Sequence, residues 1–169
     1  FDENCSFVVP DEIRALFADR AARMHRAVSR WQRQFKAWEA SHPEQAIAWR
    51  RHTSGELPEQ LEDALPVFDP AKPLATRSAS GMVINALAKV MPQLVGGSAD
   101  LAPSTMTWIK ASKGVAPGDF AGSNLHFGIR ELAMTAMING MLLHGGFRVF
   151  GATFFVFSDY CRPAIRLAA

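Results

Sequence analysis

The sequence has few cysteines and no long apolar run. Its 169 residues include two cysteines, Cys5 and Cys161, which lie far apart and have no neighbouring histidines. This spacing fits neither a metal site nor a disulfide framework, so reduced thiols in a cytoplasmic setting are expected. No segment approaches the roughly 18 consecutive apolar residues of a membrane helix, so no membrane contact is expected. The sequence given begins with Phe1 and shows no charged-then-apolar leader pattern.

Several common site motifs are also missing. The sequence contains no Gly-x-Gly-x-x-Gly, no P-loop, no Gly-x-Ser-x-Gly and no cluster of His and Cys at metal-ligand spacing. His126 and His144 are isolated in apolar surroundings and are predicted to be packed side chains. The net charge is only +2 and no basic run occurs, so a nucleic-acid partner is not expected.

Charge is distributed unevenly along the chain. Residues 1–75 carry 10 basic and 12 acidic side chains, whereas residues 76–169 carry 8 basic and only 4 acidic ones. A charge-rich first part indicates solvated helices, and the apolar, glycine-containing second part indicates a packed core. We therefore divide the chain into a helical segment, residues 1–75, and an α/β domain, residues 76–169.

The first part is predicted to form two helices and a linker. Apolar residues at three-to-four spacing predict a helix over about 11–40, capped by Asp11. The arginines of its polar face indicate a solvated surface more than a phosphate-binding stripe. Ser41 and Glu44 predict a capping box that opens a second helix, which Gly55 ends. Four prolines over 56–75 then indicate a linker or an ordered surface crossing.

The second part alternates helices with short apolar strands. Three helices are expected: one capped by Thr76 that ends at Pro92, one from about 130 to 144, and one from about 155 onward. Short strands are expected near 94–97, 125–127 and 147–153, and a loop is expected over 98–123. This order predicts an α/β fold, a parallel sheet flanked by helices, with ligands at the carboxyl ends of the strands. The last helix has no terminator before Ala169, so the chain is expected to continue.

Glu131 is the sharpest candidate for chemistry. It lies in the first turn of an apolar helix directly after a strand, where a carboxyl group among apolar side chains is expected to keep or pass a proton. An acid that only complements the helix dipole is the alternative. Phe154, Phe157 and Tyr160 are spaced three apart, so they predict either a wall for a flat heteroaromatic ring or part of the core.

Two further groups have weaker patterns. The segment from Gly96 to Ser104 places the carboxylate of Asp100 and two hydroxyls in a loop after a strand, where either a ligand approach or a tight turn explains the glycines. Arg77, at a helix start, is either an anion clamp or part of a surface salt bridge.

Linked motifs in this order resemble the transketolase family: ATRSAS (75–80), the Gly-Ser-Ala-Asp-Leu-Ala-Pro-Ser run, HFGIRELAM (126–134), NGMLLHGGF (139–147) and TFFVFSDY (153–160). The resemblance extends from about Val9, while residues 1–6 match nothing in the pattern. It implies an interdomain segment followed by most of a pyrimidine-binding domain. Such enzymes use thiamine diphosphate and a divalent metal, Mg or Ca, to transfer a two-carbon ketol unit between sugar phosphates.

The resemblance also implies roles for individual residues. Glu131 matches the catalytic glutamate that protonates or hydrogen-bonds N1′ of the aminopyrimidine. Phe154, Phe157 and Tyr160 match the pyrimidine pocket, and Asp100 matches an acid near the cofactor. The residues that hold the substrate phosphate are matched by Arg77 and Ser104.

The same resemblance places part of the cofactor site elsewhere. The metal and diphosphate ligands lie outside the matched motifs, and no metal ligand is expected in this chain. The family's cofactor lies between two subunits, so a homodimer in the cytoplasm, in the pentose phosphate pathway, is implied. A dihydroxyacetone synthase-like enzyme and a non-catalytic interaction module with the same fold are the alternatives.

Overall fold

The computed structural model describes residues 6–169, so Cys5 lies outside the described part. Contacts divide the chain into two units, Phe1–Ala48 and Trp49–Ala169. The first unit contains helix α1, Asp11–Ser41, and helix α2 begins in it and runs over Pro43–Ser54. Both predicted helices are confirmed, and α2 ends before Gly55, whose φ of +75° suits glycine.

No residue of α1 is buried, and its aromatic side chains pack along the helix itself. The ring centroids of Trp31 and Phe35 lie 5.0 Å apart, those of Phe35 and Trp38 lie 5.5 Å apart, and Trp38 stacks on His42 at 5.6 Å. The arginine-rich face is exposed, and Arg23 pairs with Asp19 at 3.2 Å. This agrees with the predicted solvated face.

The second unit contains a three-stranded parallel sheet in the order β2-β1-β3. The strands are β1, Leu94–Ser98, β2, Asn124–His126, and β3, Arg148–Ala152. In the register, Gly97 of β1 lies opposite Leu125 on one side and Gly151 on the other. A side chain at Gly97 would collide with the Leu125 carbonyl, so the close approach of β1 and β2 requires glycine. The predicted α/β fold is confirmed.

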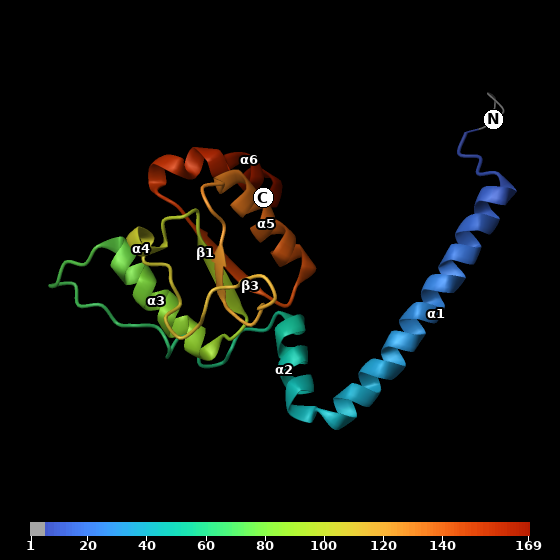
Figure 1. The fold of residues 1–169 in the computed structure, drawn as a ribbon, viewed down its shortest axis with the longest axis horizontal. Helices are drawn as coiled ribbons and strands as arrows, with labels where there is room; N and C mark the ends of the chain where they lie inside the picture. Colours follow the sequence, from blue (N-terminus) through green and yellow to red (C-terminus); the bar gives the residue numbers. More distant parts are fainter. Residues whose placement is uncertain (1–5) are drawn as a thin grey trace. The chain divides into compact units, whose positions relative to one another are not determined.

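Helices pack on the sheet (Figure 1), and buried apolar side chains form two core clusters. Helix α3, Thr76–Val90, contributes Ile84 and Leu87 to a cluster with Leu94 and Ile109. Helices α5, Glu131–His144, and α6, Ser158–Ala168, contribute Met134 and Cys161 to a second cluster with Ala99 and Phe127. The residues between α2 and α3 form turns without helix or strand, as predicted.

All three predicted side-chain caps are wrong. Asp11 and Thr76 are the first residues of their helices, and the N-cap positions are held by Pro10 and Ala75, which make no side-chain cap bond. Ser41 ends α1 instead of opening α2, because its hydroxyl donates to the carbonyls of Ala37 and Trp38, both at 3.1 Å. Pro10 and Ala75 have extended backbone, with ψ of 148° and 135°, so α1 and α3 begin without a side-chain acceptor.

Two predicted segments have more structure than expected. The 98–123 loop contains the short helix α4, Ala102–Thr105. The final helix begins as a 3₁₀ turn, Phe155–Phe157, and continues as α6. No helix in residues 6–169 is both long and apolar enough to cross a membrane.

Candidate functional site

The predicted site residues follow the carboxyl ends of the strands. Because the strands are parallel, Ser98, His126 and Ala152 end at the same edge of the sheet. Asp100 follows β1, and Thr153 and Phe154 follow β3. Gly128, with φ of +68°, makes the turn that leads from β2 to Glu131 at the start of α5. The edge at which α/β folds bind ligands therefore carries most of these groups.

Glu131 is 8% exposed and is held at both its carboxylate and its carbonyl. The Thr153 hydroxyl donates to Oε1 of Glu131 at 3.3 Å, and the Glu131 carbonyl accepts from the hydroxyl of Thr135 at 2.9 Å. As the first residue of α5, the carboxylate is also favoured by the positive end of the helix dipole. It lines a pocket of about 510 Å³ with Arg130, Leu132, Ala133 and Tyr160.

The three predicted aromatic residues form one row. The Phe154 and Phe157 rings are nearly parallel at 13°, with centroids 6.1 Å apart, and the Tyr160 ring follows at 6.4 Å from Phe157. Phe154 and Tyr160 are exposed, while Phe157 is half-buried between them. Because the row leaves ring faces and edges uncovered, it offers a flat apolar surface beside Glu131.

Arg77 and Ser104, which the resemblance assigns to the substrate phosphate, lie together. Both line a pocket of about 410 Å³, to which β3 contributes Ala152 and the residues directly after it contribute Thr153 and Phe154. Its described lining also offers the hydroxyls of Thr76, Ser80, Thr105 and Thr107, and none of the described lining residues is acidic. One guanidinium surrounded by hydroxyl donors is suited to a phosphate group. Thr153 therefore connects this pocket to the carboxylate of Glu131.

Asp100 lies apart from these two pockets. Its side chain is exposed, and its backbone adopts the left-handed conformation with φ of +60°. With His126 and Arg130 it lines a third pocket of about 510 Å³. Arg130 borders both this pocket and that of Glu131, and its Nε donates to the Phe127 carbonyl at 2.9 Å.

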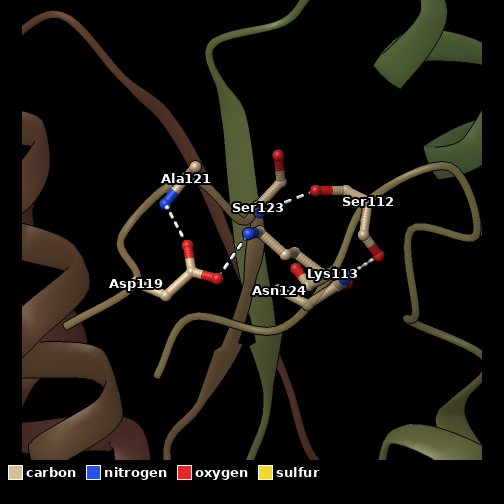
Figure 2. A network of polar contacts seen from close by, with 6 residues as sticks. All are labelled: Ser112, Lys113, Asp119, Ala121, Ser123 and Asn124. Atoms are coloured by element: carbon tan, nitrogen blue, oxygen red, sulfur yellow. Dashed lines mark hydrogen bonds and ion pairs between the residues drawn. The ribbon is translucent and has the colours of Figure 1, made fainter. Parts of the chain in front are cut away.

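Two residues of this region were missed by the sequence analysis. Thr153 is 22 residues from Glu131, so no local spacing indicates their hydrogen bond. Asn124 is 1% exposed and ties the segment before β2 to the sheet (Figure 2). Its Oδ1 accepts from the Ile109 N–H at 2.8 Å, and its Nδ2 donates to the carbonyls of Ile109 and Ser112 at 3.0 and 2.9 Å. The available signal was weak, because Asn124 directly precedes the strand expected near 125–127 and asparagine is uncommon in strands.

The prediction that His126 and His144 are packed histidines is wrong. Both are exposed, although the His126 ring lies 5.7 Å from that of Trp108. The reason is that β2 is an edge strand and α5 ends at His144, so each of the two side chains has a side open to solvent. Cys161 is a free, buried thiol, and residues 6–169 contain no group of three or more potential metal ligands.

The sequence of this chain matches the descriptions of two known domain families over most of its length. The description "Transketolase, pyrimidine binding domain" fits residues 72–169, more than half of the sequence. The chain belongs to the transketolase family. A second description, "Transketolase, thiamine diphosphate binding domain", fits residues 1–58, which include the six residues that the motif pattern left unmatched.

Individual transketolases are similar over nearly the whole chain. The chain is 52% identical over 167 residues to a transketolase of Geobacillus stearothermophilus, covering 96% of this chain and 25% of that protein. It superposes on the transketolase of Pichia stipitis in complex with sedoheptulose 7-phosphate with a TM-score of 0.91 at 34% identity, covering 99% of this chain and 26% of the other. The transketolase of Leishmania mexicana gives a TM-score of 0.91 at 34% identity, over 98% and 25% of the two chains. The chain therefore spans about a quarter of these relatives.

Proposed function

We propose that the full-length protein containing this chain is a transketolase, which transfers a two-carbon ketol unit from a ketose phosphate to an aldose phosphate. The observation that carries this proposal is the buried Glu131 carboxylate, held by Thr153 beside an aromatic row. Membership of the transketolase family supports it.

The residues present fit the aminopyrimidine half of thiamine diphosphate. A flat apolar row next to a buried carboxylate offers both ring packing and a hydrogen bond to a ring nitrogen. Thiamine diphosphate, when bound, supplies the carbanion stabilisation that ketol transfer needs. Phe157, with Phe154 and Tyr160, would pack on the pyrimidine. Asp100, which lines a separate pocket that shares Arg130 with the pocket of Glu131, is assigned to the cofactor as well.

Glu131 holds or donates a proton at N1′ of the pyrimidine in this proposal. The Thr153 hydroxyl fixes the orientation of the carboxylate, which is the condition for efficient proton transfer between positioned groups. Arg77 and Ser104 bind the substrate phosphate in the pocket that Thr153 and Phe154 also line. Binding the phosphate there orients the reacting end of the sugar toward the aromatic row.

The rest of the site is proposed to lie outside this chain. We place the diphosphate group and a divalent metal, Mg or Ca, on the remaining part of the enzyme, with the complete site between two subunits of a homodimer. In the division proposed here, residues 1–75 form the interdomain segment and residues 76–169 the pyrimidine-binding domain. The enzyme is proposed to work in the cytoplasm, in the pentose phosphate pathway.

The test uses the full-length enzyme, thiamine diphosphate and a ketose phosphate with an aldose phosphate as acceptor. Glu131→Gln is expected to lower kcat by roughly a thousandfold, the scale of positioned acid–base catalysis. Glu44→Gln, an exposed acid in the first turn of α2, is the matched control and is expected to leave kcat unchanged. Wild-type turnover by Glu131→Gln would contradict the assigned role.

Substrate choice separates the proposal from its alternatives. Efficient ketol transfer to formaldehyde in place of aldose phosphates would identify a dihydroxyacetone synthase-like enzyme, and no transfer at all would identify an interaction module. The 169-residue chain alone is expected to bind thiamine diphosphate weakly or not at all. Tight, metal-dependent binding by that chain in calorimetry would mean that the half-site is misplaced.

A further inference from the structure

A pocket between α3, α4 and residues 106–110 takes no part in the proposed ketol transfer. Its volume is about 560 Å³, within the range of small-molecule sites. It uses a different face of α3 from the phosphate pocket, because Ser78, Met82 and Asn85 line it whereas Arg77 lines the other.

The walls of this pocket are fixed by backbone contacts and by one amide. Gly81 of α3 lies so close to the Met106 carbonyl that a Cβ there would be 2.6 Å from the oxygen. The Asn85 Nδ2 donates to the Trp108 carbonyl at 3.0 Å, and Oδ1 accepts from the Lys110 N–H at 2.8 Å. Because these bonds occupy the Asn85 amide, the open surface is left to apolar side chains and to lysines.

The apolar surface is suited to a flat ring. Met82, Met106 and Trp108 line the pocket and remain exposed to solvent. An indole packs favourably on another aromatic ring, and methionine side chains adapt to ring edges with favourable sulfur contacts.

The charge of the pocket is positive. Lys89 and Lys110 line it, and none of its described lining residues is acidic. Lys72 and Lys113 each pair with an aspartate, but Lys89 and Lys110 have no ion-pair partner within residues 6–169. An ammonium on a long apolar stem can reach over such a surface and meet an anion at its rim.

We propose that this pocket binds a small amphipathic anion, an aromatic ring system that carries a carboxylate. The ring packs among Met82, Met106 and Trp108, and the carboxylate pairs with Lys89 and Lys110. The inference concerns binding only and does not depend on the proposed ketol transfer.

The experiment measures binding of 2-naphthoate and of its neutral isostere 2-naphthamide to the full-length protein by calorimetry. Naphthoate is expected to bind saturably and at least tenfold more tightly than naphthamide, which corresponds to one effective charge pair. The double variant Lys89→Gln with Lys110→Gln is expected to lose that advantage. Lys72→Gln, an exposed lysine outside the pocket, is the matched control and is expected to bind like the wild type.

Any one of the following results would overturn the proposal. The first is equal affinity for the two ligands, and the second is unchanged naphthoate affinity in the double variant. The third is absence of saturable binding, which would mean that another part of the full-length protein covers the pocket. A saturating ketose phosphate is expected not to compete, since competition would place naphthoate in the pocket of Arg77 instead.

Discussion

Helix α1 and the α/β unit stabilise their apolar side chains in different ways. Along α1, rings stack on one another in sequence and no residue is buried. In the α/β unit, two clusters join strands to helices that are distant in sequence. Local stacking gives a helix little cooperative stability, whereas a core makes each contact depend on the others. The same substitution should therefore change the free energy of unfolding by very different amounts in the two regions.

The largest difference is expected for buried polar groups. Asn124→Ala removes the partners of the Ile109 N–H and of the Ile109 and Ser112 carbonyls, and should lower the free energy of unfolding by about 4 kcal/mol. Gln32→Ala, on the exposed face of α1, should change it by less than about 0.5 kcal/mol. Urea denaturation of the 169-residue chain measures both, and a mild Asn124→Ala variant would mean that the segment before β2 is held by other contacts.

Two methionines offer an identical substitution in both regions. Met134 is 3% exposed in the cluster with Phe127 and Cys161, so Met134→Ala should cost about 3 kcal/mol. Met24 of α1 is 58% exposed, and Met24→Ala should cost less than about 0.5 kcal/mol. If thermal unfolding gave equal costs, the apolar side of α1 would have to be covered in solution, for example by a second copy.

Substitution of two threonines distinguishes a hydroxyl that acts in catalysis from one that only bonds within a helix. Thr153→Val removes the hydrogen bond to Glu131 and should lower kcat of the full-length enzyme about tenfold with little change in KM. Thr53→Val removes a bond to the Trp49 carbonyl in α2 and should leave kcat unaltered. Steady-state kinetics decides, and a Thr153→Val enzyme with normal kcat would leave Glu131 positioned by its helix alone.

The smallest effect is expected for two aspartates. Asp119 pairs with Lys113 and accepts from the Ala121 N–H at 3.3 Å, so Asp119→Ala should destabilise the chain by about 1 kcal/mol. Asp19 forms only an exposed pair with Arg23, and Asp19→Ala should cost less than about 0.5 kcal/mol. Chemical denaturation at low and high salt tests this, and an equal cost would remove the distinction between the two ion pairs.

The order of helices and strands could be predicted because each has a distinct apolar period. Glycine and proline also marked several ends, such as Gly55 after α2 and the turn before Pro92. The helix caps could not be predicted, since Ser41 and Thr76 bond within helices as readily as before them. The contacts between site residues that are distant in sequence depend on which strands lie side by side in the sheet. Thr153 meets Glu131 only because β3 ends beside the start of α5, and no spacing in the sequence encodes that meeting.

The central place of β1 has a consequence for synthesis on the ribosome. Its partner β2 follows soon after, but its other partner, β3, completes the sheet much later, and the Ser98 hydroxyl bonds the Ala152 carbonyl across 54 residues. During this interval one edge of a strand that is fully buried in the finished fold has no neighbour. An emerging chain in that state offers a pairing surface to other nascent chains, so chaperone protection is most valuable just before β3 emerges.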